Sequence, residues 1–501
     1  AVLIFFGFIL LFSDTKGKLP SSLYNFLTFF QFLPSLLKFI TIPGLLTAGF
    51  LLIILLTLLT GRTYCSFLCP LGSLQDGIGM VRRWLPVKKK RVRYSKPLNY
   101  IRYPLLVLTI LSLLFTGILG LNLLDPYANF GRIMTNLYQP LFIACRNMLS
   151  EVLVRLDIYA IHPVAQKFYQ PLPFFISLTI LLLILVMVFF RGRLYCNSIC
   201  PVGTTLGLLS RFSLFKIKIG DACTKCGSCQ KVCKAGCIDI RNMKVDESRC
   251  VACFNCIDAC SESGIGFRRT VLKSAPVVRD NSRRNFLKAG LIFSGAFPLL
   301  SQARGLQGED HVCYYSRGPV SPPGSQSIQH LKDRCIACQL CVSVCTGKVL
   351  HPAALDYGFT GMMIPKMDFE KGFCNYGCTK CGEVCPSGAI MRLSREEKKL
   401  TQTGKVYFNR DICIVKTKET ACGSCSEHCP TQAVYMVPYK DSLTIPEVNP
   451  EICVGCGACE YACPVNDPHA AIYVVANKIH SIARKQQQIK VEETTQDEFP
   501  F

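Results

Sequence analysis

Several signatures are missing from this 501-residue sequence, and each absence removes a class of function. No Cys-x-x-Cys-His motif occurs, so covalently attached haem is not expected. None of the seven histidines falls within a predicted membrane span, which argues against haem held between helices. The chain also lacks a convincing glycine-rich nucleotide loop. Only 18% of the residues are charged and half are hydrophobic, which favours a membrane protein.

Acidic residues are scarce as well, at 33 against 56 basic ones, giving a formal charge of +23. The basic residues concentrate in loops beside apolar stretches, where they set membrane orientation and meet anionic headgroups. We therefore expect a membrane surface as the surroundings of the protein, and no nucleic acid as a partner.

Cysteine, in contrast, is abundant, with 31 copies. Disulfides explain such a number only in small secreted scaffolds, whereas these cysteines fall in tight, repeated spacings typical of metal ligands. The sequence therefore predicts iron-sulfur clusters, with structural zinc as the alternative for any such thiolate array.

Apolar stretches in the first half predict four membrane spans. Residues 1–11 are too short to cross about 30 Å of hydrocarbon, so we expect the numbering to begin inside a first helix. Further spans are expected near residues 45–60, 98–124 and 172–190. Residues 26–40 and 134–158 are apolar but short, and we expect them to lie along the outer interface.

Two basic segments orient these spans. Residues 82–96 contain eight Lys or Arg, and residues 268–288 contain seven. The positive-inside rule places both in the cytoplasm. The loops around residues 13–42 and 122–170 are then outside.

An internal repeat is the most informative feature of this half. The segment from Gly61 to Gly72, GRTYCSFLCPLG, recurs from Gly192 to Gly203 as GRLYCNSICPVG. Such self-similarity predicts two related helix pairs about a pseudo-axis, so that four thiols converge. Thiolates in this number select zinc or an iron-sulfur cluster. The alternative is that cysteines four residues apart only pack or form reducible pairs. The four cysteines are Cys65, Cys69, Cys196 and Cys200.

Two bacterial ferredoxin motifs follow the repeat. In this motif three cysteines bind one cluster and the fourth reaches across to the other cluster. The spacing therefore predicts two 4Fe-4S clusters, although Lys234 and Ser261 stand where proline usually follows the fourth cysteine. Cys237 is an alternative to Cys233. The predicted ligand sets are Cys223, Cys226, Cys229 and Cys260, and Cys250, Cys253, Cys256 and Cys233.

The segment from Arg279 to Ala303 has the pattern of a twin-arginine export signal, with Arg283 and Arg284 before an apolar run. Its position in mid-chain indicates that two proteins have been joined. Uncleaved, residues 286–303 would form a fifth span of marginal length. The alternative is a basic linker before a buried helix.

Four further cysteine quartets follow this segment and predict four more clusters in an exported domain with ferredoxin-like pseudo-repeats. Three cysteines, Cys145, Cys237 and Cys313, have no assigned role. The quartets are Cys335, Cys338, Cys341 and Cys345; Cys374, Cys378, Cys381 and Cys385; Cys413, Cys422, Cys425 and Cys429; and Cys453, Cys456, Cys459 and Cys463.

The expected fold is thus a membrane bundle of four to five α-helical spans joined to two ferredoxin-like α+β iron-sulfur domains. Six 4Fe-4S clusters are expected in the ferredoxin-type quartets, with the repeat as a site for a seventh. The expected divisions are residues 1–215 (membrane domain), 216–268 (cytoplasmic two-cluster ferredoxin), 269–304 (basic linker and signal anchor), 305–476 (periplasmic four-cluster domain) and 477–501 (polar tail).

The motifs carry a family resemblance. The doubled Cys-x-x-x-Cys-Pro motif and the two-cluster ferredoxin resemble NapH/MauN-type membrane ferredoxin proteins, up to about residue 267. The part from about residue 282 is similar to NapG/MauM-type exported ferredoxins. In that family the two are separate partners of a quinol dehydrogenase that feeds a periplasmic reductase. The resemblance implies a natural fusion of the pair in the bacterial cytoplasmic membrane.

Similarity with four-cluster subunits of molybdenum oxidoreductases further implies that quartets pair first with fourth and second with third. The implied ligand sets are Cys335, Cys338, Cys341 and Cys463; Cys453, Cys456, Cys459 and Cys345; Cys374, Cys378, Cys381 and Cys429; and Cys413, Cys422, Cys425 and Cys385.

The leading hypothesis is an oxidoreductase subunit that oxidises quinol and passes electrons along 4Fe-4S clusters to a periplasmic or membrane-attached respiratory partner. Four polar residues near the outer ends of spans are candidates for the quinone site: Asp125, Tyr127, Arg132 and His162. Interfacial anchoring, with a helix-terminal turn at Asp125, is the alternative for each. A physical gap also separates the two sides, since no further cysteine set crosses the hydrocarbon.

Two other functions fit the same motifs. The chain is alternatively an electron-donating assembly factor for a metalloenzyme, as the resemblance to nitrous oxide reduction and cytochrome oxidase assembly factors implies. It is otherwise a non-catalytic electron wire within a larger respiratory complex. Pull-down stoichiometry separates these alternatives.

Overall fold

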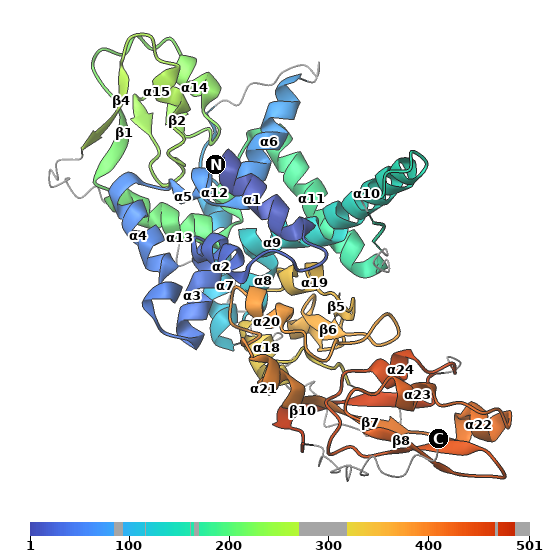
Figure 1. The fold of residues 1–501 in the computed structure, drawn as a ribbon. Helices are drawn as coiled ribbons and strands as arrows, with labels where there is room; N and C mark the ends of the chain where they lie inside the picture. The colour runs from blue at the N-terminus through green and yellow to red at the C-terminus, as the bar shows by residue number, and fades with distance from the viewer. Residues whose placement is uncertain are drawn as a thin grey trace, which may run out of the picture.

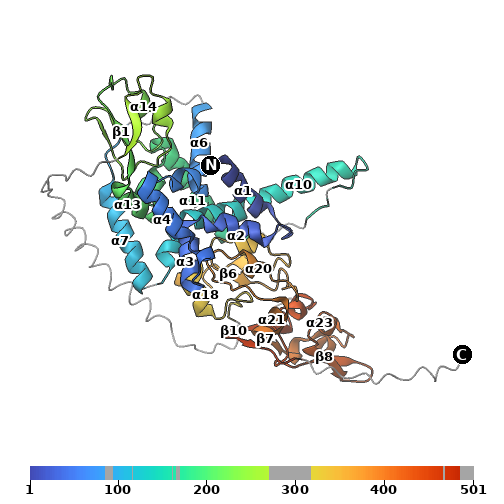
Figure 2. The same cartoon turned by 60° about the vertical axis from the view of Figure 1, so that its left-hand side comes forward.

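The computed structural model describes residues 1–84, 94–115, 117–160, 162–164, 170–269, 318–465 and 469–485. The predicted signal segment, residues 279–303, and Cys313 lie outside these ranges. Three parts follow one another in space: a helical domain, a ferredoxin module beside it, and a C-terminal module at its other end (Figure 1). Figure 2 shows the same order from a second direction.

The helical domain spans residues 1–212 and contains every long helix of the described chain. Its helices are α1 (Val2–Ser13), α2 (Ser21–Phe29), α3 (Phe32–Thr41), η1 (Leu45–Thr47), α4 (Gly49–Thr60), α5 (Tyr64–Phe67), α6 (Pro70–Trp84), α7 (Asn99–Phe115), α8 (Leu119–Leu124), α9 (Pro126–Ile133), the π-helical η2 (Met134–Tyr138), α10 (Gln139–Val154), α11 (Pro171–Arg191), α12 (Leu194–Ser198), α13 (Pro201–Leu209) and η3 (Ser210–Phe212).

The four or five full-length spans expected from the sequence are not supported. Among the described helices, α11 alone is long and apolar enough to cross a membrane, and the pair α2 and α3 counts as a second only if its 109° bend is ignored. The predicted span at residues 45–60 becomes the 12-residue α4, since η1 precedes it and Gly61 ends it with φ at 80°. The span at 98–124 is divided at Gly117, where φ is 75°.

The helical domain nevertheless presents an apolar exterior. Large hydrophobic side chains on α1, α4, α7, α10 and α11 are exposed, and Leu46, before α4, reaches 90%. Phe190, near the end of α11, is 71% exposed. Monomeric soluble proteins rarely leave extensive apolar surface uncovered, so this exterior requires an apolar environment or a partner.

The ferredoxin module, residues 215–269, consists of small strands and one-turn helices around two cavities. Strand β1 pairs antiparallel with β4, and β2 pairs with β3. This closes the module with its first and last strands, as expected for a two-cluster ferredoxin. Its elements are β1 (Phe215–Ile219), α14 (Ser228–Val232), β2 (Ile238–Asp239), β3 (Lys244–Val245), α15 (Asn255–Asp258) and β4 (Ile265–Arg269).

The C-terminal module divides into two lobes with separate cores. Residues 318–400 share the core of the helical domain, whereas most buried apolar residues of 401–485 form a core of their own, and Val474 joins the first core. The first lobe contains α18 (Ile328–Arg334), α19 (Leu340–Ser343), β5 (Leu350–Pro352), η4 (Phe359–Gly361), β6 (Pro365–Met367), α20 (Lys380–Val384) and α21 (Arg395–Leu400). The second contains β7 (Thr401–Phe408), η5 (Arg410–Ile412), α22 (Ile414–Thr417), α23 (Ser424–Glu427), β8 (Val434–Pro438), β9 (Thr444–Val448), α24 (Ala458–Tyr461) and β10 (Ile472–Ile482).

The sheets of these lobes are antiparallel pairs: β5 with β6, β8 with β9, and β7 with β10. The polar tail expected from residue 477 begins later than predicted. Residues 477–482 continue β10, and Ser481 and Ile482 pair with Gln402 and Thr401 of β7 after a bulge. The pairing supplies backbone hydrogen bonds that the polar composition of this stretch did not predict.

Candidate iron-sulfur centres

The two copies of the repeat build one site at the ends of α4 and α11. Gly61 and Gly192 end these helices with φ at 80° and 67°, which favours glycine. One-turn helices, α5 and α12, then hold the first cysteine of each copy. The second cysteine precedes a proline that starts α6 or α13, where the missing N–H costs nothing.

The four cysteines of the repeat converge, as the sequence predicted. Each is between 3% and 4% exposed. Burial, and then the neighbouring Cys196 and Cys65, raises the pKa of Cys69. Burial and then Cys65 raise the pKa of Cys196 to about 11. Cys200 interacts electrostatically with all three others. These four residues are called the repeat site below.

A pair of crossed arginines fastens the two copies together. Arg62 of the first copy donates to the carbonyl of Cys196 at 3.0 Å, and Arg193 of the second donates to the carbonyl of Cys65. A Cβ on Gly72 would lie 2.3 Å from Cys65 O, and one on Gly203 would lie 2.3 Å from Cys196 O. The close approach therefore explains the glycine that ends each copy of the repeat.

The charges of the two arginines are balanced differently. Arg193 forms an ion pair with Asp76 at 2.6 Å, and Lys234 of the ferredoxin module contacts the same carboxylate at 2.8 Å. Burial opposes ionisation of Asp76, but Arg193 and Lys234 outweigh it and lower the pKa of this carboxyl. Within the described residues, Arg62 pairs with no carboxylate and donates to Asn197 Oδ1, two carbonyl oxygens and Cys65 Sγ, the last at 3.7 Å.

Two buried donors of the repeat site have no acceptor in the part of the chain that the structure describes, namely Arg62 Nε and Gln75 Nε2. The Gln75 side chain lies against Cys196, with 3.5 Å between Oε1 and Sγ. An iron-sulfur cluster on four thiolates is anionic and supplies sulfide acceptors, so it would satisfy both the unpaired donors and the charge of Arg62. These residues fit a 4Fe-4S cluster.

Both cavities of the ferredoxin module are lined by the predicted cysteines. One holds Cys223, Cys226, Cys229 and Cys260, here called quartet A. The other holds Cys233, Cys250, Cys253 and Cys256, quartet B, together with Cys237. Cys237 is 1% exposed and its sulfur lies 3.6 Å from that of Cys233, so the geometry leaves both as potential ligands.

Left-handed residues shape four of the cysteine loops. Lys225, Ala252, Ala337 and Gly455 precede the second cysteine of their motifs, and their φ values lie between 48° and 71°. Such turns point backbone amides at the enclosed sulfurs. Ala337 N, for example, donates to Cys335 Sγ at 3.4 Å, and Gly455 N donates to Cys453 Sγ at 3.3 Å. Non-glycine residues in this region mark functional loops.

The C-terminal cysteines group differently from the pairing that the resemblance implied. Burial, and then the neighbouring Cys385, raises the pKa of Cys335 to about 12, whereas Cys463 lies with Cys413 and Cys425 in the other lobe. The first and second quartets in the sequence exchange their fourth cysteines, and so do the third and fourth, because segments that are adjacent in the sequence fold into one lobe. The observed sets are Cys335, Cys338, Cys341 and Cys385 (quartet C); Cys374, Cys378, Cys381 and Cys345 (quartet D); Cys453, Cys456, Cys459 and Cys429 (quartet E); and Cys413, Cys422, Cys425 and Cys463 (quartet F).

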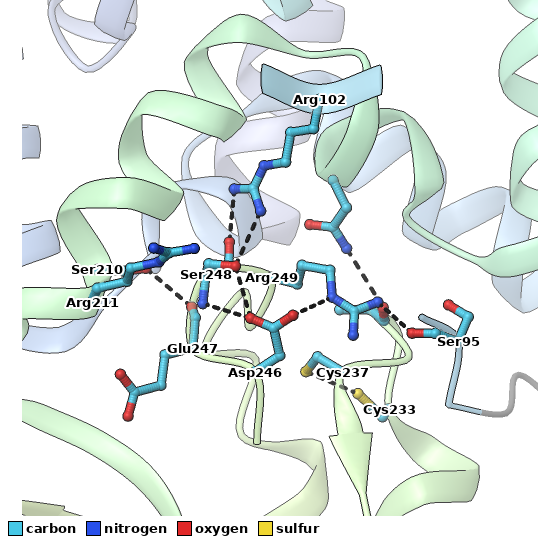
Figure 3. A network of polar contacts seen from close by, with 12 residues as sticks. Ser95, Arg102, Ser210, Arg211, Cys233, Cys237, Asp246, Glu247, Ser248 and Arg249 are labelled. Carbon is cyan, nitrogen blue, oxygen red and sulfur yellow. Dashed lines mark hydrogen bonds and ion pairs between the residues drawn. The ribbon is translucent and has the colours of Figure 1, made fainter. Parts of the chain in front are cut away.

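The ferredoxin module docks on the repeat site through the loop that precedes quartet B. Arg62 donates to Ser248 O at 2.9 Å, and Ser66 Oγ donates to Val251 O at 2.7 Å. Asp246 orders this loop by accepting from Ser248 and from Arg249, whose guanidinium also reaches Ser95 O (Figure 3). Arg62 therefore contacts both the repeat site and the loop that leads into Cys250.

The C-terminal module docks on the other side, through α9, η2 and the start of α10. Arg132 Nε donates to Ala337 O at 3.3 Å, Asn136 Nδ2 donates to Gln339 Oε1 at 2.8 Å, and Gln139 Nε2 donates to Ser343 O at 3.0 Å. A Cβ on Gly131 would lie 2.2 Å from Cys338 O. The loop of quartet C therefore lies directly against α9.

The cysteine sites thus follow one another in a single file. Cys256 of quartet B interacts electrostatically with Cys229 of quartet A, and Cys341 of quartet C with Cys381 of quartet D. The amide of Cys374 in quartet D donates to Cys456 O in quartet E at 2.9 Å. Quartets E and F share one core. These contacts give the order A, B, repeat site, C, D and E, with F in the same lobe as E. Figure 1 shows the ferredoxin module, the helical domain and the C-terminal module in the same order.

Three of the four quinone-site candidates are enclosed, and the fourth is exposed. Asp125, Tyr127 and Arg132 are at most 1% exposed and lie on α9 or at its start, beneath the C-terminal module. Asp125 caps α9 by accepting from Ala128 N at 2.7 Å, and burial raises the pKa of this carboxyl to about 7. His162 is exposed, beyond α10. The positions of these residues in the sequence did not indicate that the C-terminal module would cover them.

The sequence analysis assigned no role to the two arginines of the repeat. Arg62 and Arg193 occupy equivalent places in the two copies of the repeat, directly after the glycine. Their equivalent positions in the two copies were the sequence feature that could have revealed their role. Of the three cysteines without an assigned role, Cys145 is exposed on α10.

Three segments of the chain match two known families. Residues 42–91 and 173–220 match the family described as 4Fe-4S binding domain, a match divided between the two copies of the repeat. Residues 420–466 match the family described as 4Fe-4S dicluster domain. The chain is therefore a ferredoxin-type iron-sulfur protein of electron transfer, and 4Fe-4S clusters are its cofactors.

Among curated relatives, the uncharacterized protein MJ0750 of Methanocaldococcus jannaschii is 29% identical over 228 residues, 45% of this chain and 79% of the relative. The ferredoxin-type protein NapF of Escherichia coli is 24% identical over 147 residues, 29% of this chain and 81% of NapF. NapG of the same organism is 26% identical over 198 residues, 38% of this chain and 84% of NapG. The expected likeness to NapG-type ferredoxins is confirmed, and the likeness to the NapH-type membrane partner stays a prediction.

Proposed function

We propose that this chain is a membrane-embedded electron-transfer protein in which seven 4Fe-4S clusters form one file. The ferredoxin module carries two clusters, the repeat site carries one, and the C-terminal module carries four. The single observation behind this proposal is the place of the repeat site, which contacts the loop of quartet B through Arg62 and the loop of quartet C through α9.

The same contacts suggest how electrons cross the helical domain. Quartets A and B lie at one end of this domain and quartets C to F at the other (Figures 1 and 2). The hydrocarbon core that separates two such ends is about 30 Å thick, a distance that calls for an intermediate carrier. A cluster at the repeat site is that carrier, and it removes the need for a separate subunit between the two modules.

We further propose that the helical domain lies in the cytoplasmic membrane, with the ferredoxin module on the cytoplasmic side and the C-terminal module on the periplasmic side. Support comes from the exposed apolar side chains of α1, α4, α7, α10 and α11 and from the length of α11. Ser95, near the end of the basic segment 82–96, contacts Gly236 and Arg249 of the ferredoxin module, which favours the cytoplasmic side for this module by the positive-inside rule.

Quinol is the proposed electron source and a respiratory reductase or cytochrome subunit the proposed partner, because the relatives include Nap ferredoxins. With Asp125, Tyr127 and Arg132 enclosed, quinol would be oxidised elsewhere on the helical domain. What the protein supplies at the repeat site is four buried sulfur ligands and donors from Arg62 and Gln75 that would stabilise negative charge.

Iron and acid-labile sulfide per chain test this proposal on the detergent-purified protein. Seven clusters correspond to about 28 iron, and the quadruple variant Cys65→Ser, Cys69→Ser, Cys196→Ser, Cys200→Ser should fall to about 24. A matched control is Cys145→Ser, since Cys145 is exposed and outside every quartet. About 24 iron in both the native chain and the quadruple variant would reject a cluster at the repeat site.

A further inference from the structure

Arg132 of α9 is a wholly buried cation held by neutral groups. Its Nε donates to Ala337 O at 3.3 Å, its Nη1 to Asn129 Oδ1 at 3.3 Å, and its Nη2 to both oxygens of Asn122. Within the described residues it forms no ion pair. A buried charge is costly unless a nearby group compensates it, so the surroundings of Arg132 must contain negative charge.

The charged and titratable groups that face Arg132 come from three elements. Asp125 lies at the start of its own helix, where its carboxyl is committed to the amide of Ala128. Tyr195 faces it from α12, and Cys335 and Cys338 face it from the docked C-terminal loop. Once quartet C holds an anionic cluster, that cluster is the compensating charge.

Arg132 also stands in the middle of an unbroken hydrogen-bonded path. Asn129 Nδ2 donates to the hydroxyl of Tyr195, the residue bonded to Cys196, at 2.8 Å. Arg132 then joins Asn129 to Ala337, and Ala337 N donates to Cys335 Sγ at 3.4 Å. The path therefore runs from the repeat site to a ligand of quartet C.

We propose that Arg132 is the positioning residue that connects the repeat site to quartet C and raises the reduction potential of the cluster held there. This inference rests on the proposed function. The step it favours is the transfer of one electron: the repeat site is oxidised by one electron and quartet C is reduced by one, with no bond made or broken. A cation beside a cluster stabilises its more negative, reduced state and draws electrons toward the C-terminal module.

Docking alone does not require a cation at this position. Neutral side chains of the adjacent η2 already fasten the same loop: Thr135 Oγ1 donates to Gln339 O at 3.4 Å, and Asn136 Nδ2 donates to Gln339 Oε1 at 2.8 Å. Asn136 is therefore a matched control, since it contributes a hydrogen bond to the docked loop without a charge.

The experiment is a redox titration of the full chain in detergent, monitored by electron paramagnetic resonance. The signal of quartet C is identified by its loss in Cys338→Ser. Arg132→Gln should lower the midpoint potential of this signal by an amount equal to about a tenfold change in the reduction equilibrium, or about 59 mV for one electron. Arg132→Lys, which keeps the charge, and Asn136→Leu should leave the midpoint close to that of the native chain.

A second variant guards against loss of the cluster in Arg132→Gln. Asn129→Asp places a carboxylate 3.3 Å from Arg132 Nη1 and neutralises the cation while leaving it in place. It should lower the same midpoint. An unchanged midpoint in Asn129→Asp, or an equal fall in Arg132→Lys, overturns the role of Arg132. Absence of any signal sensitive to Cys338→Ser in the native chain would instead refute the cluster at quartet C, which belongs to the proposed function.

Discussion

At the scale of single residues, the cysteines were predictable and their surroundings were not. Spacing alone predicted the cysteines that line the two cavities of the ferredoxin module, with the choice between Cys233 and Cys237 left open, because a motif of three cysteines and a remote fourth is a local pattern. The role of Arg62 depends on contacts with Asn197 and Ser248, which lie 135 and 186 residues away. No local pattern in the sequence contains that information.

Replacing Arg62 by Met tests its role at the junction. The change leaves Asn197 Oδ1 and the carbonyl of Cys196 without their buried donor, and each lost partner costs roughly 1–3 kcal/mol, whereas Ser248 O keeps its bond from Arg102. We expect a clear fall in the thermal midpoint measured by circular dichroism. Arg155→Met is the control, since the Arg155 side chain is 77% exposed and its ion pair should contribute little. Equal midpoints for both variants would contradict the account.

Asp125 predicts a dependence of stability on pH. Burial raises the pKa of its carboxyl to about 7, whereas an unfolded chain has a value of about 3.9. Between these values the folded protein retains a proton that the unfolded chain releases, so stability should fall as pH rises from about 4 to 7 and level off above. The groups facing Asp125 are Tyr64, Tyr127, Arg132, Tyr195 and Cys338.

Asp125→Asn isolates this effect, because asparagine caps a helix as well as aspartate does. Thermal midpoints at pH 5 and pH 8 should differ less in the variant than in the native chain. The same difference in both proteins would assign the dependence to other groups.

At the scale of elements, helix existence was predictable and helix length was not. Apolar runs located α4, α7 and α11, but Gly61 and Gly117 interrupt two of these runs with positive φ and leave helices of 12 and 17 residues. The pairing of the C-terminal quartets was wrong for a related reason. Which fourth cysteine reaches which loop depends on how the lobes close, and spacing within a motif carries no information about that closure.

The docking of the C-terminal module on α9 depends on one small residue. A Cβ at Gly131 would lie 2.2 Å from Cys338 O, a backbone atom that cannot move without displacing the loop. Gly131→Ala should therefore separate the module from α9 and increase amide hydrogen exchange in residues 335–341. Gly79→Ala on α6 is the matched control, since a Cβ there meets no atom within 4 Å. Unchanged protection in Gly131→Ala would mean that α9 does not hold the loop.

At the scale of the whole molecule, the order of sites was the least predictable feature. Topology placed the two cysteine blocks on opposite sides of a membrane and suggested a gap between them. The folded chain brings both modules against the same helical domain, with the repeat site between the loops of quartets B and C. The doubled cysteine repeat, for which the sequence left packing or reducible pairs as an alternative to metal binding, thus lies between the two cluster modules.

Electron flow across a sealed membrane tests this central position most directly. The full chain is reconstituted in liposomes with ferricyanide trapped inside, dithionite is added outside, and the absorbance of ferricyanide is followed without added quinone. Empty liposomes correct for leakage, and Cys145→Ser serves as the control variant. Our account predicts reduction by the native chain and the control, and none above leakage by the quadruple serine variant of the repeat site. Equal rates in the native chain and the quadruple variant would contradict it.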